Sequence, residues 1–372
     1  MKRITILIAL LVLLGLPVSA QQTADGQMIV NVFGNFHTGF GQLNDVRGFE
    51  LDRSYIGYQQ NLPGNLEIKA VMDIGQSKSV SDYHRIAYIK NAQISWKNGN
   101  WKLSGGLIST IQFNMQEKFW GYRYVMKSFQ DEYKFGSSAD LGISAAYQFN
   151  DNFMMDAIIV NGEGYKKVQV EDGLAYGLGM TAQVLDGLTL RLYGSLNEAT
   201  PGLDDSYNLA AFAGYKDNDF SIGVEYNAYW NSGYTKDANQ SGFSVYSSQK
   251  LSDKVSIYAR ADQLTSKDDW NKANDGMLSL VGVEIKLNKY IQLSPNLRVW
   301  TPKADGMKDE FVSVEHLFLG LVETADPALK QLFTAYGIQK EGCLQALQTI
   351  RGNQRVTTDS PEGTYDALGK YG

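Results

Sequence analysis

The chain has 372 residues, with 34 lysines and arginines against 40 acidic residues and a formal net charge of −6. Acidic and basic residues are interspersed, which argues against nucleic acid as a partner, and a single cysteine excludes a disulfide framework. With 37 glycines, 22 tyrosines and only 7 prolines, the composition favours glycine- and aromatic-rich β structure over disorder.

Residues 1–20 have the pattern of a Sec signal peptide. Lys2 and Arg3 precede an apolar run over residues 4–16, and the small residues Ser19 and Ala20 provide a cleavage site. The alternative is an N-terminal membrane anchor, but the run is shorter than the roughly 20 residues that a spanning helix needs. No other long apolar run occurs in the sequence, so we exclude a helical membrane protein and expect an exported one.

Residues 27–300 repeat a strand pattern about ten residues long. Apolar and polar side chains alternate with a period of two, most clearly over residues 66–74, 188–196, 220–226, 255–261 and 291–299. Such a period places one apolar face of a strand in an apolar medium and the other in a polar one. A soluble β-sandwich and a transmembrane barrel both fit this pattern.

The lengths of the connections distinguish the two folds. Short turns (62–65, 97–100, 150–152, 185–187, 216–219, 251–254, 287–289) alternate with long polar loops (40–47, 76–84, 162–173, 198–204, 232–240, 265–274). Short turns at one end and long loops at the other are typical of outer-membrane barrels. We therefore predict an all-β transmembrane antiparallel β-barrel over residues 21–304. About fifteen strands precede Trp300, one fewer than the even number of sixteen that we expect of a bacterial barrel.

The polar face of such a barrel lines a lumen, which is aqueous at this strand number. The predicted lumen-lining side chains are four basic and four acidic residues, Lys69, Arg191, Arg260, Arg298, Glu67, Asp73, Glu225 and Asp262. Because the two signs balance, these strands alone predict no strong ion selectivity.

The connection over residues 111–136 is the longest and most aromatic one. A loop of this length is usually functional or disordered, and its aromatic content argues against disorder. We expect it to fold into the lumen as a constriction that carries Lys118, Arg123, Lys127 and Lys134, with Glu117, Asp131 and Glu132 offsetting most of that charge. The alternative is a loop that packs outside, as a lid or a trimer latch.

Two stretches carry a family resemblance. Residues 119–149, which begin FWGYRYVMKSF, and residues 280–300, which read LVGVEIKLNKYIQLSPNLRVW, resemble the Bacteroidetes branch of the phosphate-selective porins. The resemblance covers about residues 21–300. It implies a sixteen-stranded homotrimeric barrel in the outer membrane, surrounded by lipid, through which small hydrophilic and phosphate-like anionic solutes diffuse passively. The sequence departs from the family in two ways, because it lacks a dense lysine cluster and a terminal strand ending in an aromatic residue.

Residues 307–372 change to a helical period. Four short amphipathic helices are predicted, the first capped by Ser313, the second opened by Asp326 and Pro327, the third closed by Gly352 and the fourth opened after residue 359. This segment resembles the N-terminal Clp-repeat domain of ClpB-type AAA+ chaperones, without its first repeat. No G-x-x-x-x-G-K-[ST] motif occurs in the sequence, so we expect no ATP-driven activity.

No catalytic constellation is found in the sequence. His37, His84 and His316 are far apart in it, and Cys343 has no neighbouring histidine and acid. We therefore expect no enzyme activity, no metal site and no cofactor.

Two functions remain open. The first is an outer-membrane porin, and the alternative is an ATP-independent fragment of a ClpB-type N domain that binds protein substrates or adaptors. Because chaperones of that type are cytosolic and barrels are exported, we interpret residues 305–307 as an assembly or recombination joint between two genes. The alternative is an evolved two-domain porin. We also predict that the joined chain assembles poorly, since an unclosed barrel leaves backbone groups unpaired in lipid.

Overall fold

The computed structural model of the chain describes residues 26–40, 46–76, 85–167 and 173–303, together with residues 322, 330–331, 333–334, 338–339 and 342–343. The predicted signal peptide (1–20) lies outside the described residues, and so does nearly all of the predicted helical segment (307–372). The four-helix prediction therefore stays a prediction.

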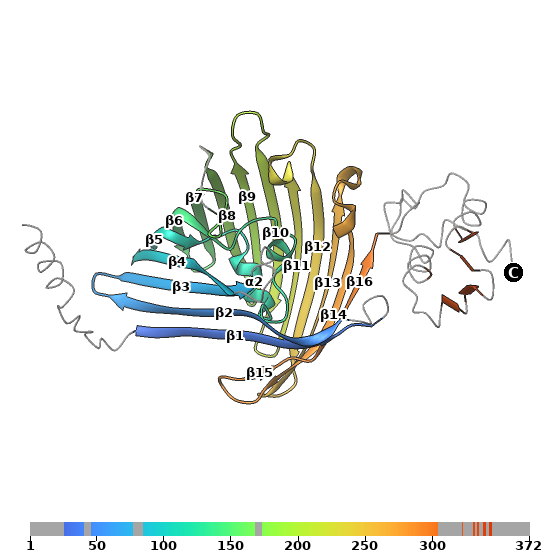
Figure 1. Cartoon of the computed structure of the whole chain (residues 1–372). Helices are drawn as coiled ribbons and strands as arrows, with labels where there is room; N and C mark the ends of the chain where they lie inside the picture. Colours follow the sequence, from blue (N-terminus) through green and yellow to red (C-terminus); the bar gives the residue numbers. More distant parts are fainter. Residues whose placement is uncertain are drawn as a thin grey trace, which may run out of the picture.

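A single antiparallel sheet contains all sixteen described strands, and β1 to β15 follow one another across it in chain order (Figure 1). The strands are β1 (Gly26–Thr38), β2 (Arg47–Leu62), β3 (Leu66–Gln76), β4 (Arg85–Asn98), β5 (Trp101–Ser109), β6 (Ala139–Asn150), β7 (Phe153–Val160), β8 (Ala175–Leu185), β9 (Leu188–Asn197), β10 (Ser206–Lys216), β11 (Phe220–Trp230), β12 (Gln240–Lys250), β13 (Val255–Ser266), β14 (Gly276–Lys286), β15 (Gln292–Leu293) and β16 (Asn296–Pro302). As predicted, short turns alternate with long loops along this series.

The last two strands share one position in the sheet. β15 pairs with residues 285–286 of β14, and β16 pairs with residues 276–282 of the same strand. The interruption lies at Ser294 and Pro295, because proline has no backbone N–H to donate to the ladder. The sixteen strands therefore occupy fifteen positions, in agreement with the predicted count.

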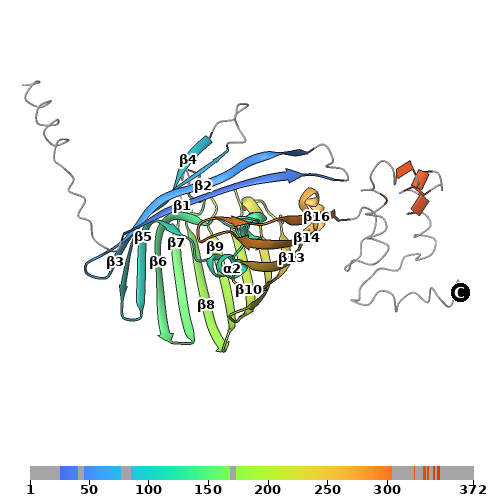
Figure 2. The ribbon, with the colours of Figure 1, turned by 90° about the horizontal axis from the view of Figure 1, so that it is seen from below.

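The sheet curves strongly but is not closed (Figure 2). Among the described residues, β1 pairs only with β2, and β15 and β16 pair only with β14. In an antiparallel series, the first and the fifteenth positions run in the same direction, so the alternating ladder cannot be continued across the gap. The prediction of a barrel is thus correct for the strands and their order, while the closed cylinder is absent from the described structure.

The two faces of the sheet differ as the sequence predicts. In β9, Leu190 and Leu192 are 40% and 44% exposed on one face, while Arg191 and Tyr193 are each 4% exposed on the other. The apolar side chains thus point outward and the polar ones into the curve of the sheet. Within the described residues, no helix is both long enough and apolar enough to cross a bilayer.

Candidate functional site

The connection between β5 and β6, residues 110–138, lies within the curve of the sheet (Figures 1 and 2). We refer to it as the inner loop. It contains two short helices, α2 (Asn114–Trp120) and α3 (Phe129–Glu132). Gly121 ends α2 in the left-handed conformation, with φ of 74°, and donates its N–H to the Glu117 carbonyl.

One side of the inner loop packs on the wall formed by β10 to β14. The Tyr122 ring stacks on Tyr258 with a centroid separation of 4.1 Å, and Trp120 lies 5.6 Å from Tyr246. Farther along, Phe129 is completely buried in a cluster that includes Leu264. Aromatic burial of this extent holds the loop firmly on this wall.

Three arginines of the sheet, on β9, β13 and β16, bind backbone carbonyls of the inner loop. Arg191 donates from Nη2 to the Ile111 carbonyl at 2.8 Å, Arg260 donates from Nη1 to the Lys127 carbonyl, and Arg298 donates from Nη2 to the Val125 carbonyl. Two of these arginines also have acidic partners, since Arg191 pairs with Asp156 at 2.8 Å and Arg260 pairs with Asp262 at 2.6 Å. These guanidinium groups therefore act as attachment points for the loop.

The predicted lumen-lining set is corrected by this arrangement. Five of its eight members, Asp73, Arg191, Glu225, Arg260 and Asp262, are no more than 4% exposed, so the prediction that they line water is wrong. Their side chains are on the expected face, but the inner loop or ion pairs cover them. Glu67, Lys69 and Arg298 keep access to solvent.

The four predicted constriction cations fall into two groups. Arg123 pairs with Glu117 and Asp131, each at 3.0 Å, and Lys127 lies 3.8 Å from Asp131. Lys118 and Lys134 are exposed. The inner loop therefore presents part of the expected charge, and its own carboxylates neutralise the rest.

Strands β3 to β5 and the inner loop contribute to a lysine cluster. Lys69 of β3 is within electrostatic range of Lys90 of β4, Lys102 of β5 and Lys118 of the inner loop, and also of Glu67 on its own strand, which opposes their effect. The sequence analysis missed Lys90 and Lys102. A signal was present at the short turn before β5, where Lys97 and Lys102 pair directly across the β4–β5 ladder and so share one face.

A second connection also reaches this cationic region. Tyr165, in the loop between β7 and β8, donates its hydroxyl to the Asp73 carboxylate of β3. Its neighbour Lys166 lies 5.2 Å above the Tyr88 ring, and Lys90 lies 4.7 Å above Tyr55. These contacts draw a second loop inward, which the sequence analysis did not predict.

Burial shifts the pKa of a charged side chain in each of the two loops. It raises the pKa of the Glu117 carboxyl above its usual range, against the opposing effect of Arg123. It lowers the pKa of the Lys166 ammonium, and Arg53 lowers that pKa further while Asp73 opposes the shift. The charged groups around Lys166 are thus close enough to shift its pKa.

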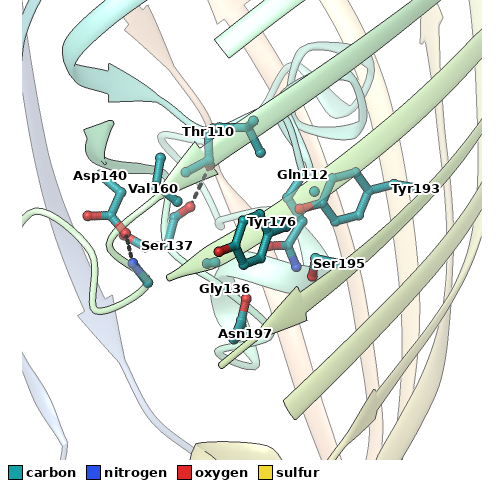
Figure 3. A pocket seen from close by; sticks show the side chains of 14 residues that line it. Thr110, Gln112, Gly136, Ser137, Asp140, Val160, Tyr176, Tyr193, Ser195 and Asn197 are labelled. Carbon is teal, nitrogen blue, oxygen red and sulfur yellow. Dashed lines mark hydrogen bonds between the residues drawn. The ribbon is translucent and has the colours of Figure 1, made fainter. Parts of the chain in front are cut away.

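A small polar cavity of about 40 Å³ lies where the inner loop leaves the sheet (Figure 3). Gln112 and Ser137 of the loop line it together with Tyr193 and Ser195 of β9. Its volume suits a few water molecules, so we assign it to the packing of the loop base.

The fold is similar to those of OmpT and OmpF, two proteins of known structure. OmpT of Vibrio cholerae matches with a TM-score of 0.50 and 17% identity, over 74% of this chain and 87% of that one. OmpF of Salmonella typhi matches with a TM-score of 0.54 and 13% identity, over 73% and 88% of the two chains. At this identity, the similarity concerns the fold alone.

By sequence, the chain is similar to a different class of protein, the ClpB chaperones. ClpB chaperones of Bacillus cereus and Bacillus anthracis are 49% identical to this chain over 70 residues, and ClpB of Clostridium tetani is 46% identical over 69 residues. The 70-residue matches cover 19% of this chain and only 8% of the length of those chaperones. No family model matches the chain. Within the residues that the structure describes, no group of three or more histidine, cysteine or acidic residues is placed to hold a metal ion.

Proposed function

We propose that the chain is an outer-membrane porin for passive diffusion of small hydrophilic solutes, with small phosphate-like anions favoured. One observation carries the proposal, namely that the inner loop docks on the β10–β14 wall while its Lys118, together with Lys90 and Lys102, remains within electrostatic range of Lys69. Groups of lysine or arginine at a constriction favour anions electrostatically. The porin-like fold supports the same function.

The proposal includes a signal peptide over residues 1–20, contact of the sheet with outer-membrane lipid, and assembly as a homotrimer. The exposed outer face of the sheet, with side chains such as Leu178 and Ile143 at 49% and 60% exposure, suits contact with lipid tails. Cleavage near residue 20 and a trimeric assembly are expected from the signal-peptide pattern and the family resemblance.

The second candidate function is an ATP-independent protein-binding segment. The 49% identity to ClpB chaperones over 70 residues favours it. Because the match spans 8% of those proteins, their activity does not extend to this chain as a whole. We place the segment at residues 307–372 and interpret residues 305–307 as an assembly or recombination joint between two genes.

The anion preference is tested by the reversal potential of the protein in a planar bilayer under a KCl gradient. We expect chloride to be favoured over potassium, and Lys69→Glu and Lys118→Glu each to lower that preference severalfold. Lys254→Glu is the matched control, because Lys254 is exposed in the short turn before β13. A potassium preference in the unmodified protein, or equal effects of all three substitutions, would refute the anion preference.

A further inference from the structure

The curved sheet has two edges that no described strand covers. One edge is β1, which pairs only with β2 among the described residues, and the other is β16, which pairs only with β14. Both edges border the opening of the curve (Figure 2). A sheet edge presents a row of backbone N–H and C=O groups that can pair with a further strand.

The side chains of the two edge strands are more exposed than those of an inner strand. Val30 and Val32 of β1 are 56% and 64% exposed, and Leu297 of β16 is 49% exposed. No residue of β1 or β16 is buried, whereas β9, which is paired on both sides, buries Arg191 on its inner face. A strand between the two edges would cover these side chains.

Both edges impose the same alternation on such a strand. Phe33 of β1 packs edge-on against Tyr55 with 5.6 Å between the ring centroids, and Arg298 of β16 binds a carbonyl of the inner loop. These side chains therefore point inward, and the residues before them, Val32 and Leu297, point outward. A strand that pairs with both edges must then place apolar side chains outward and polar ones inward.

The direction of such a strand follows from the order of the sheet. β1 runs toward the long loop at 39–46, and the β15–β16 position starts after the short turn at 287–291, so both run from the short-turn end to the long-loop end. Direct pairing of the two edges would be parallel. A second copy of the chain in the same membrane orientation presents edges of this same direction. Only a strand of the opposite direction pairs antiparallel with both edges.

We propose that the opening binds one extended segment of a separate polypeptide, which adds a strand between β1 and β16 and closes the sheet. The segment alternates apolar and polar residues over about 9–11 positions, the length of a tilted strand that crosses a bilayer. Backbone hydrogen bonds to the two edges supply the affinity, and the alternation supplies the specificity. This role is independent of which solute the proposed channel passes.

A fluorescent synthetic peptide of about eleven residues, in which valine alternates with threonine, tests the site on the detergent-refolded full chain. We expect saturable binding by fluorescence anisotropy. A peptide of the same composition in scrambled order should bind at least about tenfold more weakly, because its valines fall on both faces of the strand. Both peptides partition into detergent alike, so equal binding of the two, or no saturable binding of the first, would overturn the proposal.

Disulfide crosslinking locates the bound peptide, in a chain whose native thiol is removed by Cys343→Ser. A cysteine at the centre of the peptide should crosslink to Val32→Cys on β1 and to Leu297→Cys on β16, which lie near the middle of the two edges. Leu192→Cys is the matched control, because this side chain is 44% exposed on the outer face of β9 but its strand has both neighbours. Equal crosslinking at all three positions would refute an edge site.

The two ends of β1 test the direction of the peptide. A cysteine at the N-terminus of the peptide should crosslink to Phe36→Cys, near the long loop, and a cysteine at its C-terminus to Val30→Cys, nearer the short-turn end. The reverse pattern would contradict antiparallel addition. A disulfide between Val32→Cys and Leu297→Cys of one chain without peptide would show that the edges pair directly, and the proposal would be wrong.

Discussion

At the scale of single residues, burial decides what a charged side chain can do. Arg191 and Arg260 are on the polar face that the strand alternation predicts, but at 4% and 3% exposure they bind loop carbonyls and acidic partners. Lys69 and Lys118 retain solvent access and belong to the lysine cluster. The alternation predicts which face of the sheet a side chain lies on. Whether that side chain is buried depends on contacts with residues distant in the sequence.

Glu117 predicts how the stability of the protein depends on pH. Burial raises the pKa of its carboxyl above the ordinary 4.5, so the native state binds more protons than the unfolded chain just above that pH. Stability therefore falls as the pH rises from 4.5 through the raised pKa. Glu117→Gln removes this dependence, so its melting temperature relative to the unmodified protein should be higher at pH 7 than at pH 4.5. A difference that is larger at pH 4.5 would contradict the assignment.

At the scale of elements, the inner loop organises the interior. Its aromatic side chains pack against tyrosines of β12 and β13, and arginines from three strands bind its carbonyls. This attachment makes the loop a fixed part of the concave surface, and its Lys118 is within electrostatic range of Lys69 on β3.

Trp120→Ala tests the attachment of the loop. Trp120 is 2% exposed, its indole N–H donates to the Met126 carbonyl at 2.8 Å, and its ring lies next to Tyr258. Truncation of a buried tryptophan should cost about 3–5 kcal/mol of unfolding free energy, measured by denaturant titration of the detergent-refolded protein. Tyr290→Ala, which alters an 81% exposed ring in a turn, serves as the control and should cost far less. Equal losses in both variants would show that Trp120 does not anchor the loop.

Much of the fold follows from the sequence, but less of the site does. The alternation and the loop lengths predict the strands and their order, because neighbouring strands joined by short turns pair locally. The length and aromatic content of residues 111–136 mark the loop as important. The wall on which it docks depends on long-range contacts such as Tyr124 with Glu284, and no local pattern reports them. For the same reason, the sequence does not predict that Lys90 joins the lysine cluster or that Tyr165 binds Asp73.

At the scale of the whole molecule, the sheet has two open edges. β1 and the β15–β16 position are each paired on one side only among the described residues, and they run in the same direction. Unpaired backbone groups in lipid cost several kcal/mol each. We therefore keep the expectation that the joined chain assembles with low yield in a membrane.

The central proposal is that the curved sheet provides a water-filled path across a membrane. Single-channel recording of the purified full chain in a planar bilayer tests it most directly. The account predicts stepwise conductance that persists at low voltage and that changes when the loop anchor Trp120 is replaced. A bilayer that stays silent with protein whose far-UV spectrum is mainly β would contradict the account.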